Sequence, residues 1–254
     1  MRLTRVFVDA PLADGALLSL PPGPAQHLAR VLRLAAGDAL VLFNGRGGEH
    51  TARIEAVRRD TVTVRIGALD ALERESPLMT ILLQGIARGD KMDHIVQKAT
   101  ELGVSRVIPV LTARGSVRLD AASARRKQDH WQAVAIAACE QSGRNRVPEV
   151  VQPATLAVAL TGMAAALRLV MAPDDDAASL PVLLASAAGA RAARSIALLV
   201  GPEGGLDAAE VSAAQLAGFR PCRLGPRVLR TETTALAALA ALQFAAGDLA
   251  DPVQ

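Results

Sequence analysis

The feature that most constrains the fold is a change in hydrophobic pattern near residue 77. From Leu78 onward, short apolar runs alternate with stretches whose apolar residues recur at helical spacing. Leu78–Leu83 and Val104–Val110 predict strands. The stretch between them predicts a helix that Asp90 caps and Gly103 ends, with an apolar face formed by Met92, Ile95, Val96, Ala99 and Leu102. A strand–helix–strand unit of this kind requires parallel strands covered by helices, so the sequence predicts an α/β domain.

The alternation continues along the rest of the chain. Lys127–Ser142 predicts a helix, and Ile196–Val200 predicts an apolar strand. Asp207 followed by Glu210 predicts a capping box at the start of a further helix. The Ala- and Leu-rich segment Thr231–Ala246 predicts the last helix.

The residues before this domain are rich in strand signals. Short β-branched runs separated by turn-forming residues predict strands at Ala39–Phe43, His50–Val57 and Thr61–Ile66. One helix is predicted over Pro24–Leu34, with Leu28, Val31 and Leu32 on one side. Closely spaced strands around a single helix predict a small β-barrel. The polar stretch 73–77 then separates two expected domains, residues 1–72 and 77–254.

Several classes of protein are excluded by what the sequence lacks. No apolar run approaches the roughly 20 residues that a bilayer-spanning helix needs, and no secretory signal is visible. Two cysteines, Cys139 and Cys222, are too few for a disulfide framework or a zinc site, so we expect packing roles for both. Walker A, G-x-S-x-G, H-E-x-x-H and C-x-x-C motifs are absent. We therefore expect a cytoplasmic protein without a catalytic metal.

A glycine-rich stretch, Gly201–Gly205 (GPEGG), lies between the apolar strand and the helix that Asp207 starts. In a parallel sheet, ligands bind beyond the carboxyl ends of the strands, and glycine lets the backbone approach them closely. The stretch is not G-x-G-x-x-G, and Glu203 places a carboxylate where a phosphate would sit. A cofactor without phosphates therefore fits better than a dinucleotide. The alternative is a tight strand-to-helix turn with no ligand.

A second polar segment, LGPRVLRTETT, covers residues 224–234 and runs into the last helix. Arg230 immediately precedes that helix, where the positive end of the helix dipole disfavours a cation, whereas Glu232 lies in the first turn, where an anion is favoured. An arginine at a position where the helix dipole disfavours positive charge indicates a functional site. The alternative is a surface pair between Arg230 and Glu232.

Basic residues are concentrated in the middle of the chain, with eleven Arg and Lys against seven Asp and Glu over residues 76–150. Arg88, Lys91 and Lys98 lie on or near one predicted helix, and Arg30 and Arg33 project from the helix of the first domain. Such a spread of positive charge is typical of phosphate binding, although a solvated surface gives a similar pattern. Aromatic residues make up 2% of the chain and Tyr is absent, so base-stacking platforms are not expected.

Four segments together resemble the RsmE family, the 16S ribosomal RNA uridine N3-methyltransferases of the SPOUT superfamily. They are RGDKMDHIVQKATELGV (88–104), CEQSGRNRVPEV (139–150), LLVGPEGGL (198–206) and LGPRVLRTETTALAAL (224–239). HLARVLRLAAGD (27–38) and ERESP (73–77) resemble the PUA-like N-terminal domain of the same family. Residues 151–195 match the family poorly.

The resemblance implies a SPOUT-type parallel sheet with a C-terminal trefoil knot, preceded by a PUA-like β-barrel. It further implies a homodimer that binds S-adenosylmethionine in the knot. Carried over by motif, the cofactor-binding residues are Leu199, Val200, Gly201, Pro202, Glu203, Gly204, Gly205, Leu224, Gly225, Pro226, Val228, Leu229 and Arg230.

The implied substrate is a uridine of 16S ribosomal RNA near the decoding region of the small subunit. Our hypothesis is that Arg230 stabilises negative charge on the base, while Glu232 orients Arg230 or accepts the N3 proton. The expected RNA contacts are Arg5, His27, Arg30, Arg33, Arg88, Lys91 and Lys98. Two alternatives stay open: another SPOUT enzyme acting on tRNA or on a ribose 2′-hydroxyl, and a non-enzymatic RNA-binding assembly factor.

Overall fold

The computed structural model describes residues 3–59, 61–172, 177–186 and 194–250. The chain forms two compact units. The first contains Met1–Glu75 and Ile136–Val147, and the second contains Ser76–Ala135 and Pro148–Gln254. Residues 136–147 thus group with the first unit, although they lie in the middle of our expected second domain.

The first unit is built on a five-stranded sheet with strand order β1-β3-β4-β5-β2. β1 and β3 are parallel and the other neighbours are antiparallel. The strands are β1 (Thr4–Phe7), β2 (Leu17–Ser19), β3 (Ala39–Phe43), β4 (Glu49–Arg58) and β5 (Thr61–Asp70). The three predicted strands are confirmed. Alternate residues of β4 and β5 are buried, because one face of an antiparallel sheet covers the core.

The predicted helix of this unit has a different geometry from the one expected. A short α-helix, α1 (Pro22–Gln26), continues as a π-helix, η1 (His27–Val31), in which Leu32 N–H donates to His27 C=O. Because i→i+5 bonding changes the angular spacing of side chains, the 3.6-residue pattern does not hold here. Leu28 is buried as predicted, but Val31 is 66% exposed and Leu32 is 40% exposed.

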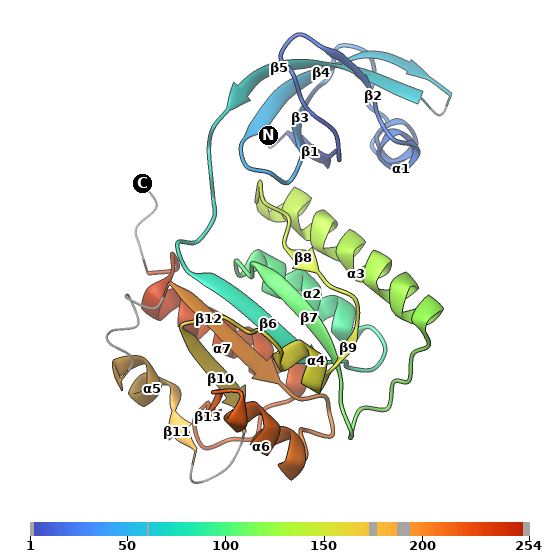
Figure 1. Ribbon diagram of the computed structural model, residues 1–254. Coiled ribbons are helices and arrows are strands. Elements are labelled where there is room, and N and C mark those ends of the chain that lie inside the picture. The colour runs from blue at the N-terminus through green and yellow to red at the C-terminus, as the bar shows by residue number, and fades with distance from the viewer. Residues whose placement is uncertain (1–2, 60, 173–176, 187–193, 251–254) are drawn as a thin grey trace. The chain divides into compact units, whose positions relative to one another are not determined.

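The second unit contains an eight-stranded parallel sheet with the order β11-β13-β10-β12-β6-β7-β8, in which β9 also pairs with β7 (Figure 1). The predicted strands are confirmed as β6 (Met79–Gly85), β7 (Arg106–Leu111) and β12 (Ser195–Val200). The pattern did not predict β8 (Glu149–Val150), β9 (Ala154–Thr155), β10 (Leu167–Met171), β11 (Ala178–Ser179) and β13 (Arg220–Arg223).

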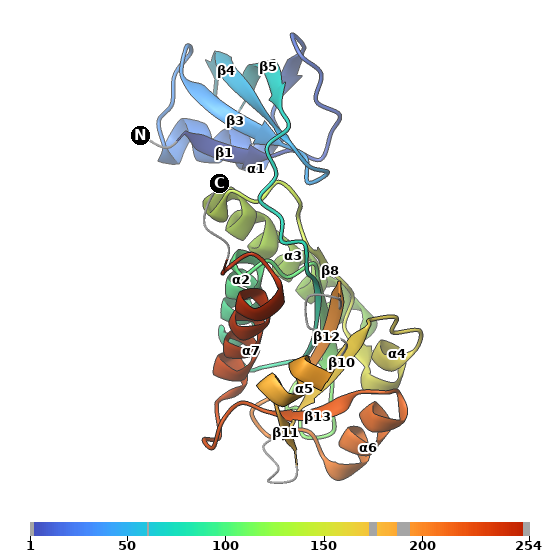
Figure 2. The same ribbon diagram turned by 90° about the vertical axis from the view of Figure 1, so that its left-hand side faces the viewer.

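Helices cover both faces of this sheet. α2 (Lys91–Glu101) and α7 (Thr231–Ala246) lie on one face, while α4 (Leu156–Leu160) and α6 (Ala208–Leu216) lie on the other (Figure 2). Successive strand residues therefore enter different cores: Leu82 packs with α2 and α7, and its neighbour Leu83 packs with α4 and α6. Strands buried on both faces are continuous apolar runs, which explains why these were predictable.

The remaining helices are α3 (Ala121–Ser142), which begins six residues before its predicted start, and α5 (Leu180–Ser186). The capping box of Asp207 and Glu210 is confirmed at α6. The expected cap at α2 is wrong: Asp90 precedes the helix, but it has helical backbone angles and its side chain makes no capping hydrogen bond. An N-cap side chain accepts from the helix backbone when its own residue is extended, as Asp207 is.

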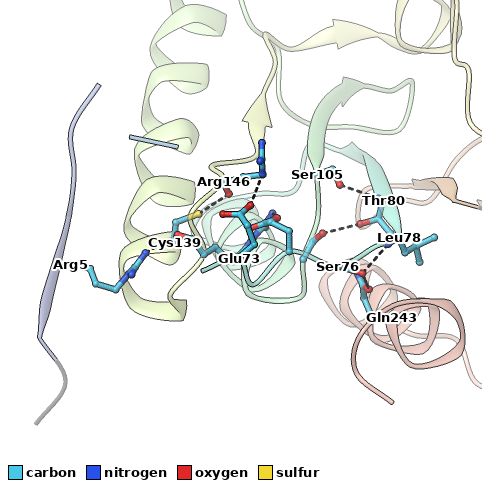
Figure 3. A network of polar contacts seen from close by, with 12 residues as sticks. Arg5, Glu73, Ser76, Leu78, Thr80, Ser105, Cys139, Arg146 and Gln243 are labelled. Carbon is cyan, nitrogen blue, oxygen red and sulfur yellow. Dashed lines mark hydrogen bonds and ion pairs between the residues drawn. The ribbon is translucent and has the colours of Figure 1, made fainter. Parts of the chain in front are cut away.

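Ion pairs hold residues 144–146 to the rest of the first unit. Arg146 pairs with Glu73, as Figure 3 shows, and Arg144 pairs with Glu75. Asn145 is fully buried, accepts from Arg5 at 2.6 Å and donates to Leu72 C=O at 2.7 Å. The polar stretch that we predicted as a linker is thus paired in a network. None of the helices in the described parts of the chain is long and apolar enough to cross a membrane.

Candidate active site

Two loops of the second unit converge at the carboxyl edge of the parallel sheet. One follows β12 and the other follows β13, and β10 lies between these two strands. They meet where the Thr231 hydroxyl donates to Gly201 C=O at 2.6 Å. A cavity of about 910 Å³ lies between the loops, and its lining includes residues 200–208 and 222–231. This is the position where α/β sheets bind ligands.

The glycines of the β12–α6 loop are required by close backbone approach. A Cβ on Gly201 would lie 2.9 Å from Gly205 C, and one on Gly204 would lie 3.0 Å from Arg114 Cβ. Gly205 has a φ of +69°, a conformation that residues with a side chain rarely adopt. The loop therefore folds tightly on itself and against the segment that follows β7.

A buried polar relay supports both loops from below. Gln84, at the end of β6, is fully buried, and its Nε2 donates to the Thr231 hydroxyl at 2.9 Å and to Gly85 C=O at 2.9 Å. The Thr231 hydroxyl in turn donates to Gly201 C=O. Three segments far apart in the sequence are thus joined by hydrogen bonds in a place where water cannot substitute for them.

Lys91 and Glu203 are two of the charged residues that line the cavity, and Glu232 pairs with Lys91 without lining the cavity itself. Lys91 Nζ lies 3.5 Å from Glu203 Oε1 and 3.5 Å from Glu232 Oε2, and Arg88 N–H donates to Glu203 Oε1 at 3.1 Å. Burial disfavours the charged form of Glu203. Hydrogen bonds from its own and the Arg88 backbone N–H, together with the Lys91 charge, outweigh burial and hold the pKa of this carboxyl below its usual value of 4.5.

Arg230 occupies the position expected from the sequence, directly before α7, with an extended backbone. Its side chain is exposed, lines the cavity and makes no hydrogen bond or ion pair with any residue that the structure describes. The alternative of a surface pair with Glu232 is wrong, because the Glu232 carboxylate pairs with Lys91 instead. A free guanidinium beside a cavity is available to a ligand.

Most of the predicted cofactor residues are brought together. Leu199 is buried within β12 and does not line the cavity, whereas the others do: Val200, Gly201, Pro202, Glu203, Gly204, Gly205, Leu224, Gly225, Pro226, Val228, Leu229 and Arg230. Sequence reasoning missed Arg114 and Thr234, which also line it, and Gln84 beneath it. A polar Gln at the end of an otherwise apolar strand was the available signal for Gln84.

The predicted RNA contacts of the first unit fall into two groups. His27, Arg30 and Arg33 are exposed on η1 and the turn after it, where Arg33 has a φ of +54°. Arg5 is 8% exposed, pairs with Glu49 and lies over the Phe43 ring. A phosphate cannot reach a guanidinium that is buried and paired, so Arg5 is not among the contacts that we propose below.

In the second unit, Arg88 is exposed and Lys98 pairs with Glu101 at 2.8 Å on the outer face of α2, whereas Lys91 lines the cavity.

Both cysteines are buried, which raises the pKa of Cys139 to about 12 and that of Cys222 to about 11. Within residues 3–59, 61–172, 177–186 and 194–250, no three His, Cys, Asp or Glu side chains are grouped to hold a metal ion.

Comparison with known proteins assigns the chain to a family. Residues 74–243 match the model of an RNA methyltransferase domain, and residues 25–67 match that of an RNA methyltransferase PUA domain. The chain is 32% identical over 247 residues to the ribosomal RNA small subunit methyltransferase E of Bacillus subtilis, covering 95% of this chain and 96% of that relative. The chain belongs to the ribosomal RNA small subunit methyltransferase E family.

Solved structures of this family share the fold. A ribosomal RNA small subunit methyltransferase E from Neisseria gonorrhoeae, bound to S-adenosylmethionine, is 37% identical with a TM-score of 0.87, covering 98% of this chain and 100% of that one. A protein from Legionella pneumophila, described as a methyltransferase and solved with bound S-adenosylmethionine, is 39% identical with a TM-score of 0.92 and the same coverage. The family predicted from the four segments is confirmed, as is a methyltransferase-type α/β fold with an N-terminal PUA-like domain.

Proposed function

We propose that this protein transfers the methyl group of S-adenosylmethionine to N3 of a uridine in 16S ribosomal RNA of the small subunit. The observation that carries the proposal is the cavity between the β12 and β13 loops, whose lining includes the glycine-rich stretch Gly201–Gly205 and Arg230. Two relatives with this fold bind S-adenosylmethionine, and several are named ribosomal RNA small subunit methyltransferase E.

The residues at the cavity fit this cofactor. A volume of about 910 Å³ lies within the usual range for small-molecule sites. The glycine-rich loop presents backbone groups for the adenine and methionine parts, and Glu203 suits a molecule that carries a sulfonium and an ammonium rather than phosphates. Residues 200–205 and 224–230 would hold it. When bound, the cofactor supplies a methyl group activated by the positively charged sulfur.

Two side chains of this protein act on the uridine in the proposed reaction. N3 would have to lose its proton before it could accept a methyl group. The Glu232 carboxylate accepts that proton, and Arg230 stabilises the negative charge that develops on O2 or O4. Alignment of the nucleophile with the methyl group contributes much of the remaining rate enhancement.

His27, Arg30 and Arg33 of the first unit, with Arg88 and Lys98 of the second, bind RNA phosphates in this proposal. Removing one such cation weakens RNA binding and lowers its dependence on salt by about one counterion. Arg30→Ala should therefore reduce RNA affinity and its salt slope without changing cofactor affinity. Arg65→Ala, an exposed Arg of β5 paired with Glu55, is the control. An unchanged salt slope in Arg30→Ala would exclude Arg30 as a phosphate ligand.

Three further parts of the proposal rest on the family resemblance: a trefoil knot formed by the two cofactor loops, a homodimer and a cytoplasmic location. The meeting of the β12 and β13 loops at Gly201 and Thr231 supports the first. Light scattering during size-exclusion chromatography tests the second, and a monomeric mass at working concentration would exclude it.

Methylation of small ribosomal subunits tests the main proposal. The protein is incubated with labelled S-adenosylmethionine and subunits from cells that lack it, and the nucleosides are identified by mass spectrometry. We expect N3-methyluridine with the wild type and none with Arg230→Ala. A methyl group on tRNA or on a ribose 2′-hydroxyl would establish the alternative enzyme, and calorimetry without cofactor binding would favour the assembly factor.

A further inference from the structure

Lys91 connects two parts of the site that the sequence keeps far apart. It is the first residue of α2, and its ammonium lies 3.5 Å from a carboxylate oxygen of Glu203 and 3.5 Å from one of Glu232. Glu203 belongs to the loop after β12, and Glu232 belongs to the first turn of α7. Lys91 lines the cavity, whereas Lys98 of the same helix pairs with Glu101 on the outer face of α2.

The two carboxylates depend on Lys91 to different degrees. Glu203 also accepts the Arg88 N–H, but Glu232 Oε2 is buried and has no hydrogen-bond partner among the residues that the structure describes. Two oxygens that both lie within 3.5 Å of one nitrogen are at most about 7 Å apart. Without the ammonium, the two negative charges would repel each other, and Glu232 would lose its one ion-pair partner among the described residues.

We propose that Lys91 is a positioning residue for methyl transfer, which holds the Glu232 carboxylate in place and ties it to the cofactor loop through Glu203. The proposal rests on the proposed function, in which Glu232 accepts the N3 proton. It gives Lys91 a role different from the phosphate binding that its charge alone indicates. Lys91 touches neither uridine nor cofactor in this proposal and acts through the two carboxylates.

Kinetics with two substitutions at Lys91 test the proposal. Lys91→Met removes the charge but keeps most of the side-chain length, and Lys91→Arg keeps the charge. At saturating RNA and cofactor, we expect Lys91→Met to lower the single-turnover rate about 100-fold, because a displaced base is no longer oriented toward the proton. Lys91→Arg should react at least about tenfold faster than Lys91→Met, because it keeps the charge. RNA affinity and its salt slope should not change. Lys127→Met, the same change on α3 outside the cavity, is the control.

Phosphate binding by Lys91 predicts the opposite pattern. If Lys91→Met keeps the saturated rate but weakens RNA binding and lowers the salt slope by about one, the positioning role is overturned. Glu232→Gln provides a second check. Its effect on the rate should be much smaller in the Lys91→Met background than in the wild type, because both changes remove the same positioned carboxylate. Additive effects would contradict the proposal.

Cofactor binding gives a readout that requires no RNA. Calorimetric affinities for S-adenosylmethionine are compared for the wild type, Lys91→Met, Glu203→Gln and the double variant. We expect non-additive changes, since Lys91 and Glu203 form one ion pair. A wild type that binds the cofactor but methylates no uridine would refute the proposed function and leave the Lys91–Glu203 connection standing. Additive cofactor affinities would refute that connection and leave the proposed function standing.

Discussion

The hydroxyl of Thr231 is the group on which the closure of the two cofactor loops depends. It accepts from Gln84 and donates to Gly201 C=O, and Thr231 is 6% exposed. Thr231→Val keeps the shape but removes the hydroxyl that donates to Gly201 C=O and one of the two acceptors of the Gln84 amide, which should cost about 1–3 kcal/mol of unfolding free energy. We also expect weaker cofactor binding, because Gly201 is the first residue of the loop that lines the cavity.

The control for this change lies on the same turn. Thr233 is exposed, so Thr233→Val should change stability by less than about 0.5 kcal/mol. Urea denaturation and calorimetry with S-adenosylmethionine measure the two quantities. Equal stability losses at both positions would mean that the hydroxyl relay contributes nothing specific.

Two glutamates of the first unit should respond to pH in opposite directions. Burial disfavours the charged form of Glu49, but the hydrogen bonds and charges of Arg5 and Arg74 outweigh it, so the pKa of this carboxyl lies below 4.5. Burial raises the pKa of Glu140 above 4.5, against the smaller effects of the Phe7 N–H, His27 and Arg5. Ionisation therefore stabilises the fold at Glu49 and destabilises it at Glu140.

The signs determine what each Gln variant does. The contribution of Glu49 is present above pH 4.5 and is lost as the pH falls through its lowered pKa, so Glu49→Gln should be destabilising at pH 7 and nearly neutral in acid. The favourable contribution of neutral Glu140 is present below pH 4.5 and is lost as the pH rises through its raised pKa. Glu140→Gln should thus be stabilising at pH 7. Unfolding free energies from about pH 3.5 to about pH 7.5 measure both, and parallel pH profiles for the two variants would contradict the assignment.

Individual site residues were predictable where a local rule made them unusual. Arg230 was unusual because it immediately precedes a helix N-terminus, where the helix dipole disfavours positive charge, and its place beside the cavity is as expected. The orientation of the Lys91 side chain toward the cavity was not predictable. Periodicity shows which residues share a face of a helix, but not which other segments of the chain lie beside its first turn. Arg114 and Gln84 follow or end strands whose order in the sheet the sequence does not state.

At the scale of the element, the two aspartates that precede helices make a matched pair. Asp207 accepts from Glu210 N–H in the capping box of α6, whereas Asp90 precedes α2 without a capping bond. Asp207→Ala should cost about 1 kcal/mol, a fall of roughly 2–4 °C in melting temperature for a protein of this size. Asp90→Ala should cost less than about 0.5 kcal/mol. Thermal denaturation without cofactor checks both, and equal losses would show that the bond seen at α6 is not what stabilises it.

A helix or strand was predictable when its own residues show the apolar pattern that burial requires. β6, β7 and β12 lie inside the sheet and are continuous apolar runs. β13, with the sequence RPCR, carries two arginines and a proline and is recognisable as a strand through its pairing with β10 and β11. η1 follows α1 without any break in composition, so the local sequence gave no signal of the change to π-helical hydrogen bonding.

At the scale of the whole molecule, the division into units does not follow the linear sequence. Residues 136–147 lie between two stretches of the second unit, yet they supply the first unit with partners for side chains near residues 5 and 72–75. A polar segment such as Glu73–Glu75 suggested a free linker because the sequence shows its charges but not their partners. Arg144 and Arg146, which pair with it, come from about 70 residues later.

This arrangement predicts how the first unit behaves when it is isolated. A fragment of residues 1–75 lacks Asn145, so the buried Arg5 loses a hydrogen bond and Leu72 C=O loses its donor. Residues 1–75 joined by a Gly/Ser linker to residues 136–147 regain both. We expect the joined form to be more stable by about 2–4 kcal/mol, because a buried charge left partly unpaired is strongly destabilising. Urea unfolding followed by circular dichroism measures the difference, and Asn145→Ala in the joined form should abolish most of it. If both fragments unfold at the same urea concentration, residues 136–147 are not part of the folding unit.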